Sequence, residues 1–207
     1  MPASLVDEAG KAALTAAIQA VEAVSSAEVV ITVRPSSGFY LHADLLVGVV
    51  VGVATLTFLL FSHVEFAIPW FVVDPIVMGA LAAWLSSRSP GLRRLLTPRR
   101  LRRRWVRAAA YAAFYERGVR LTAERTGILV YVSHLERDAA LIGDQGVVTV
   151  VPPERWHAAA DAIAGAVARG RGSAGIAAEV SALAGLLGPY LPRAEDDINE
   201  LPDEVNL

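Results

Sequence analysis

The chain has 207 residues, of which 54% are hydrophobic and 19% are charged. This composition is too apolar for one ordinary water-soluble domain and excludes a disordered chain, so part of the chain is expected to lie in lipid. The absence of cysteine excludes a disulfide framework, thiol catalysis and a Cys-ligated zinc or iron–sulfur site. The net charge of −2 averages a strongly basic middle against an acidic C-terminus, so it says little about partners.

The first residues predict a helix and a strand, and no export signal. Residues 7–24 carry apolar side chains at helical spacing. Residues 28–34 are β-branched and stop at Pro35, which is typical of a strand buried on both faces. The basic region and the continuous apolar region of a secretory signal are missing. Residues 1–38 are therefore expected to supply the first helix and strand of an α/β domain.

Two apolar segments, residues 45–61 and 66–85, are each about long enough to span a hydrocarbon core of roughly 30 Å. The short connector between them predicts a tight transmembrane hairpin, residues 43–87, inserted into the α/β domain. A buried helix pair in a soluble protein is the alternative, which the near absence of polar residues disfavours. Gly48 and Gly52 form a G-x-x-x-G pattern that would permit close helix approach and a homodimer.

Asp74 is the one charged residue within the two predicted spans. An ionisable group in lipid is costly, so Asp74 is by default a candidate functional residue, either for a proton or for a partner contact. Pro75 would loosen the helix beside it. The alternatives are that Asp74 lies nearer to the membrane interface than these boundaries place it, or that it pairs across a dimer.

A dense run of arginines follows the second span, within residues 88–107. Positive residues this close to a span are retained in the cytoplasm, and a hairpin returns both flanks to the same side. Both soluble parts are therefore predicted to be cytoplasmic, at the inner (cytoplasmic) membrane. Nucleic acid is not an expected partner, because no recognisable nucleic-acid-binding fold surrounds the run. Contacts with anionic lipid headgroups are expected from Arg99, Arg100, Arg102, Arg103 and Arg104.

The chain after the arginines alternates helical and strand patterns. A helix of about five turns is predicted to end at Gly127. The next two strands, residues 127–133 and 139–142, are expected to be antiparallel neighbours because their connector is short. Residues 146–151 are β-branched and predict a further strand, which Pro152 stops.

Two amphipathic helices are predicted in residues 153–170 and 173–191, and residues 192–207 form an acidic tail expected to be flexible. Without the hairpin, the order of elements is α, β, α, β, β, β, α, α. This order predicts an α/β sandwich with a mixed central sheet and helices packed on it. Residues 1–38 are too few to fold alone, so their strand is expected to join the sheet made by residues 108–191.

The stretch LTAERTGILVYVSHLERDAALIGDQGV, followed by PPERW and preceded far upstream by AEVVITVR, resembles the TPM-domain family. That family includes a thylakoid-lumen protein of photosystem II repair, a nematode acetylcholine-receptor auxiliary protein and many bacterial membrane proteins. The resemblance implies a three-layer α/β fold and membrane attachment. It also implies calcium binding and a weak acid phosphatase activity, centred on acidic loop residues near Gly143 and Asp144. Many members carry a cleavable export signal, whereas this chain shows none and is interrupted by its hairpin.

Four residues of this stretch are candidates for ligand or partner binding: Asp144, Glu136, Arg137 and Asp138. Asp144 is also the candidate metal ligand, and calcium is the only cofactor that the resemblance suggests. Neighbours along a strand point to opposite faces, so not all four can converge, and calcium requires six to eight oxygen ligands. The simpler interpretations are that Asp144 is a turn residue bonded to the backbone and that Glu136 and Arg137 form a solvated loop pair.

Two functions remain open at the level of sequence. In the first, the chain is a membrane-anchored, non-catalytic accessory or adaptor module of a membrane complex, with an unknown membrane protein as partner. In the second, it is a metal-assisted, acid phosphatase-like hydrolase. No catalytic residue is assigned, because the chain has no P-loop, EF-hand or G-x-S-x-G pattern. The non-catalytic interpretation is favoured.

Overall fold

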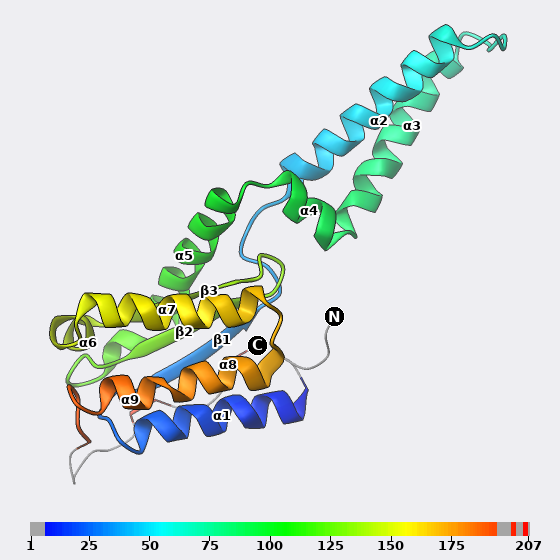
Figure 1. The fold of residues 1–207 in the computed structure, drawn as a ribbon. Helices are drawn as coiled ribbons and strands as arrows, with labels where there is room; N and C mark the ends of the chain where they lie inside the picture. Colours follow the sequence, from blue (N-terminus) through cyan, green and yellow to red (C-terminus); the bar gives the residue numbers. More distant parts are fainter. Residues whose placement is uncertain (1–6, 194–199, 202–204, 207) are drawn as a thin grey trace. The chain divides into compact units, whose positions relative to one another are not determined.

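The computed structural model describes residues 7–193, 200, 201, 205 and 206. The chain forms two compact units. Unit 1 consists of Met1–Ser37 together with Arg103–Leu207, and unit 2 consists of Gly38–Arg102. The fold is mixed α/β, with the sheet in unit 1 and two long apolar helices in unit 2 (Figure 1).

Unit 1 is built on a mixed four-stranded sheet with the strand order β3-β2-β1-β4. The central strands β1 and β2 run parallel, with Ile31 opposite Val130, and β3 runs antiparallel to β2, with Leu141 opposite Val130. The strand that precedes the hairpin in sequence therefore joins strands that follow it, as expected from the sequence. The bounds are β1 Val29–Arg34, β2 Ile128–Ser133, β3 Asp138–Gly143 and β4 Val205–Asn206.

Four helices pack against one face of this sheet. Their apolar residues, among them Leu14, Ile163 and Val180, form one buried cluster with Ile31 and Val130. Helical spacing of these residues predicts the first and second of these helices correctly, whereas the single helix predicted over residues 173–191 is divided in two at Ala182. The four helices are α1 Glu8–Glu22, α7 Pro153–Ala168, α8 Gly172–Ser181 and α9 Leu183–Leu187.

The opposite face is covered by α5 (Arg99–Glu116) and the short 3-10 helix η2 (Val119–Leu121). Val106, Ala110 and Phe114 of α5 share a second buried cluster with Leu129 and Tyr131 of β2. Side chains alternate along β2, so the two faces of one strand serve two different cores. This explains the uninterrupted apolar run of the strand.

The helix predicted to end at Gly127 ends earlier, at Glu116 of α5. Gly118 adopts a left-handed backbone with φ of 68°, which breaks the helix at little steric cost. Gly127 has a different role, because a Cβ atom there would lie 2.0 Å from the Val119 carbonyl oxygen. The turn before β2 thus depends on the absence of a side chain at Gly127.

The strand predicted in residues 146–151 is wrong, because this segment is helical: α6 spans Gln145–Val150. Asp144 caps this helix, its Oδ1 accepting from the Gln145 backbone nitrogen at 2.7 Å. Gly146 packs directly on the preceding turn, where an added Cβ would meet the Glu124 carbonyl oxygen at 2.5 Å. The local cap and this close packing outweigh the β-propensity of the valines.

The acidic tail predicted for residues 192–207 lies mostly outside the described residues. Within the described part, Val205 and Asn206 pair with Ile31 and Thr32 of β1 and form an edge strand of the sheet.

Unit 2 contains α2 (Leu41–Phe61) and α3 (Trp70–Ser87), which are both long and apolar enough to cross a membrane, followed by α4 (Pro90–Leu96). Only 17% and 11% of their most apolar stretches are buried, which argues against a soluble core pair. The two helices approach closely, since a Cβ on Gly48 would lie 2.8 Å from the Gly79 carbonyl oxygen. Gly52 similarly faces Pro75. The G-x-x-x-G glycines therefore pack within the hairpin.

Candidate functional site

Asp144 is a structural residue at the junction of β3 and α6. Its carboxylate caps α6 and also pairs with Arg125, with Oδ1 3.1 Å from Nη2 and Oδ2 3.3 Å from Nε. The partner carboxylate raises the pKa of the Arg125 guanidinium. Both carboxylate oxygens of Asp144 are thus engaged, and the side chain is only 7% exposed. The predicted turn role is confirmed and extended by this ion pair.

Glu136 is buried, so the interpretation of Glu136 and Arg137 as a solvated loop pair is wrong for Glu136. Its Oε1 accepts from the Ser37 backbone nitrogen at 3.0 Å, and its Oε2 accepts from Ser133 Oγ. Ser37 Oγ in turn lies 3.0 Å from the Tyr131 hydroxyl. The carboxylate was mistaken for a surface group because its partners come from a segment 99 positions earlier in the chain.

The same network alters the acidity of Tyr131. Burial raises the pKa of the Tyr131 phenol, against a smaller lowering by its hydrogen bond to Ser37. Arg137, by contrast, is exposed at the hairpin turn and adopts a φ of 49°. The four candidate residues do not converge on one point, and no group of three or more metal-ligating side chains occurs within the described part of the chain.

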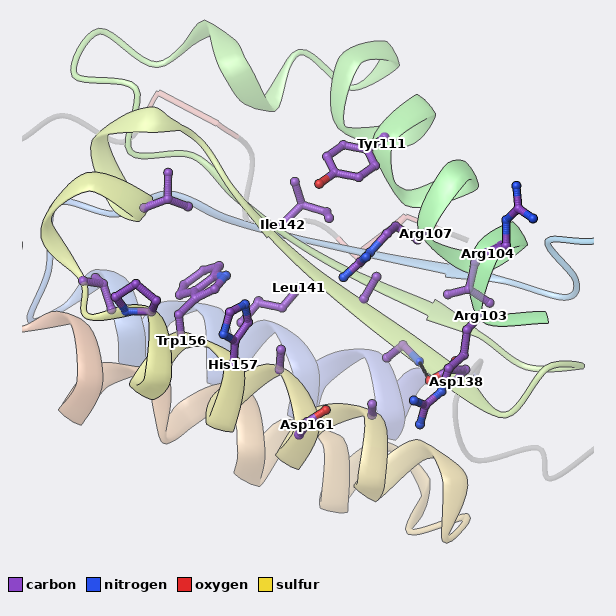
Figure 2. Close-up of a pocket in the computed structure, with 18 residues that line it drawn as sticks. Arg103, Arg104, Arg107, Tyr111, Asp138, Leu141, Ile142, Trp156, His157 and Asp161 are labelled. Atoms are coloured by element: carbon purple, nitrogen blue, oxygen red, sulfur yellow. Dashed lines mark hydrogen bonds and ion pairs between the residues drawn. The ribbon is translucent and has the colours of Figure 1, made fainter. Parts of the chain in front are cut away.

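Asp138 belongs to a different feature, a groove of about 550 Å³ in unit 1. The groove follows β3, the edge strand of the sheet, between α5 on one side and α7 on the other (Figure 2). Asp138 Oδ2 lies 3.8 Å from Arg103 Nε, and its Oδ1 accepts from the Ala139 backbone nitrogen at 3.0 Å. The sequence did not reveal this groove, because its lining residues lie on elements that are distant in the chain.

The two walls of the groove differ in chemistry. The α5 wall carries Arg103, Arg104 and Arg107. The α7 wall is mainly apolar and includes the buried side chain of Trp156. Its exposed groups include Asp161 (Figure 2). The floor consists of the small or aliphatic residues Ala139, Ala140, Leu141 and Ile142. A cationic wall facing an apolar wall is suited to binding an amphipathic, acidic ligand.

The five arginines predicted to contact lipid lie in three different environments. Arg103 and Arg104 line the groove of unit 1, whereas Arg99 and Arg100 are exposed in unit 2. Arg102 is partly buried, and its Nε atom is enclosed. The groove arginines therefore have a local role open to them besides contact with lipid headgroups.

Unit 2 contains a buried polar cluster that sequence reasoning missed. Asp44, in the first turn of α2, is 5% exposed and pairs with Arg93 of α4, with Oδ2–Nη2 and Oδ1–Nε distances of 2.5 and 3.1 Å. Ser86 Oγ of α3 donates to Asp44 Oδ1 at 3.0 Å, and Arg93 lies over the Tyr40 ring. The cluster joins α2, α3 and α4. An acidic residue just before the first span and an arginine just after the second were the available signal.

Asp74 lies near one end of its helix. Helix α3 begins at Trp70, four positions later than the predicted span, so Asp74 falls within its first two turns and is partly exposed. This placement is that of the alternative in which Asp74 lies nearer to the end of the span.

Comparisons with known proteins support the fold and leave the function open. No protein-family model matches the chain, and no curated protein matches it. The NMR structure of the BA42 protein from the psychrophilic bacterium Bizionia argentinensis is similar, with a TM-score of 0.58 and 17% sequence identity. The similarity covers 95% of this chain and 91% of that protein. At this level of identity, the two proteins are alike in fold alone.

Proposed function

We propose that this protein is a membrane-anchored, TPM-like α/β module that acts non-catalytically, as an accessory or adaptor subunit of a membrane complex. The observation that supports the proposal is the groove along β3, whose cationic and apolar walls suit a ligand segment. Among the candidate residues, Asp144 is held by Arg125 and by α6, and Glu136 is held by Ser37 and Ser133. Carboxylates committed in this way are poor metal ligands and poor general bases.

The proposal includes a three-layer arrangement for unit 1, as the resemblance to the TPM-domain family implies. Support comes from the two buried clusters, one between the sheet and α1, α7, α8 and α9, the other between the sheet and α5. The BA42 likeness supports a fold of this kind at the level of topology.

For location, we propose the inner membrane, with both soluble parts in the cytoplasm. The parallel pairing of β1 with β2 supports a hairpin topology, because strands on either side of the two apolar helices must lie on the same side of a membrane to pair. Arg99 and Arg100, exposed next to α4, would contact anionic headgroups. A homodimer would need a surface other than Gly48 and Gly52.

The membrane orientation is tested by fusing to the C-terminus a reporter enzyme that is active only after export. We expect an inactive fusion for the intact chain. The matched control is the same reporter inserted between α2 and α3, which should be active. An active C-terminal fusion would contradict the cytoplasmic assignment.

The adaptor role is tested by affinity purification of the full chain from detergent-solubilised membranes. We expect one membrane protein to be recovered in stoichiometric amount. Purified protein is assayed in parallel with p-nitrophenyl phosphate and calcium. Metal-dependent turnover that is lost in Asp144→Ala, without a stoichiometric partner, would favour the hydrolase and overturn the adaptor role.

A further inference from the structure

We infer that the groove of unit 1 takes an extended, acidic peptide segment of a partner protein, which adds as a strand to the free edge of β3. The inference rests on the proposed adaptor function and specifies the chemistry of the partner. Three observations carry it: the orientation of the β3 backbone, the composition of the strand and the charges of the groove walls.

The backbone of β3 presents groups to the groove that pair with no other strand among the described residues. Asp144 donates its backbone N–H to the Gly127 carbonyl at 2.9 Å, in continuation of the β2–β3 register. In an antiparallel pair, hydrogen-bonded and non-hydrogen-bonded residue pairs alternate. Ile142 and Ala140 therefore bond to β2, whereas Leu141 turns its N–H and C=O away from β2, toward the open edge.

The same alternation applies to Ala139, whose N–H is taken by Asp138 Oδ1. Its carbonyl faces the open edge beside that of Leu141. An incoming strand at the usual spacing of about 4.8 Å would find these groups in position for a backbone ladder.

The composition of β3 leaves this edge unprotected. Natural edge strands are usually blocked by lysine, by proline, by a bulge or by a covering element. The segment from Ala139 to Gly143 has no charged residue and no proline, and its pairing with β2 is regular. The opposite edge of the sheet differs, because β4 covers Ile31 and Thr32 of β1. An open, regular edge set between two helices is typical of a strand-addition site.

The charges of the walls select the side chains of the incoming strand. The side chains of Arg104 and Arg107 on α5 make no ion pair or hydrogen bond within the described residues, and Figure 2 shows Arg107 reaching toward Leu141. Side chains of an added strand would alternate between the α5 wall and the α7 wall. Acidic residues fit the first wall, and small apolar residues fit the second, beside Ala160 and Ala164. Asp161 on α7 repels acidic side chains on that side. The acidic residues of the peptide are therefore expected to face α5 and its apolar residues to face α7.

The test uses the full chain in nanodiscs of phosphatidylcholine and a fluorescent peptide of four Glu-Val repeats. We expect saturable binding that weakens with salt, and no binding of the matched Lys-Val peptide. Two further peptides are N-methylated at every second residue, one at the Glu positions and one at the Val positions. Only one of the two should lose binding, because one set of N–H groups faces β3. Equal binding of both would overturn strand addition.

Protein variants locate the site. Arg107→Glu should weaken binding by roughly tenfold or more, whereas Arg155→Glu, at an exposed position of α7 outside the groove, should leave it unchanged. The Leu141 amide should exchange its hydrogen at least roughly tenfold more slowly with peptide bound. Unchanged binding by Arg107→Glu would contradict the inference. A second outcome would also contradict it: slow hydrogen exchange at Leu141 without peptide that depends on protein concentration. That result would indicate that β3 pairs with β3 of a second copy.

Affinity purification with the same variant separates this inference from the adaptor role. Loss of the partner with Arg107→Glu, but not with Arg155→Glu, supports both. A stoichiometric partner retained by Arg107→Glu would overturn the groove as its site while the adaptor role stands.

Discussion

Unit 1 and unit 2 place similar residues in opposite positions. In unit 1 the aliphatic side chains lie inside, with Ile31, Val130 and Ile163 almost fully buried. In unit 2 large apolar side chains such as Val49 and Phe58 are exposed, and the interior holds small and polar groups, including Gly48 and Asp44. The contrast is the one expected if water surrounds unit 1 and lipid surrounds the two apolar helices of unit 2, as we propose. Apolar burial from water drives the first, whereas close packing of small residues and polar contacts hold the second together.

The largest effect is expected from a change that breaks unit 1 alone, Gly127→Ala. The added methyl group would collide with the Val119 backbone, so we expect unit 1 to lose more than about 3 kcal/mol of unfolding free energy. Hydrogen exchange of β2 amides in urea measures the loss. Gly185→Ala is the matched control, because a Cβ there meets nothing within 4 Å. Equal stability of the two variants would show that the turn adapts.

The corresponding change in unit 2 is Asp44→Ala, which leaves Arg93 without its partner. We expect a loss of about 2–3 kcal/mol, below the range for a fully buried pair because the Arg93 side chain remains 24% exposed. Hydrogen exchange of α4 amides should accelerate while that of β2 stays the same. Asp44→Ala combined with Arg93→Met should recover part of the loss, since it removes the stranded charge. Faster exchange in β2 would show that the two units are coupled.

A smaller effect is expected at Asp144, and it distinguishes a structural from a chemical role. Asp144→Ala removes the α6 cap and should cost unit 1 about 1 kcal/mol. Asp144→Asn retains a capping oxygen and should remain within a few tenths of a kcal/mol of the parent. Urea denaturation of both variants measures the difference. Calcium-dependent stabilisation of the parent that disappears in Asp144→Asn would instead identify a metal ligand.

The smallest effect concerns pH. The pKa of Tyr131 is raised in the folded state, so the unfolded chain loses this proton first as pH rises. The protonated Tyr131 phenol therefore contributes its full stabilisation of the folded state below about pH 10, the ordinary pKa of tyrosine. This contribution is lost progressively at higher pH. Tyr131→Phe should cost about 1 kcal/mol or less at pH 7 and should show a weaker loss of stability between pH 10 and 11. The urea midpoint as a function of pH checks this. Identical alkaline profiles would contradict the assignment.

Local sequence patterns predicted the helices and strands of both units well but predicted the polar contacts between them poorly. The periodicities of α1, β1 and β2 and the apolar runs of α2 and α3 are visible in the sequence because burial repeats at regular intervals. Glu136 was misjudged because its partner Ser37 is remote in sequence. The helix α6 was missed because the cap and the packing of Gly146 outweigh the preference of valine for strands.

The groove could not be predicted for a similar reason. It requires α5 and α7, two helices separated by the whole β2–β3 hairpin, to flank the same edge strand. In the sequence, the arginines of α5 are part of a charge run next to an apolar segment. Only in the folded unit do three of them lie along β3. Asp44 was missed because the first span was predicted to begin at residue 45, just after it.

The parallel pairing of β1 with β2 also dictates an order of events during synthesis. β1 leaves the ribosome first, but its neighbour β2 is translated only after both apolar helices, and chains grow at about 5–20 residues per second. The apolar strand β1 therefore waits for several seconds without its partner β2 while α2 and α3 are translated. The sheet of unit 1 can therefore close only after the whole of unit 2 has been synthesised.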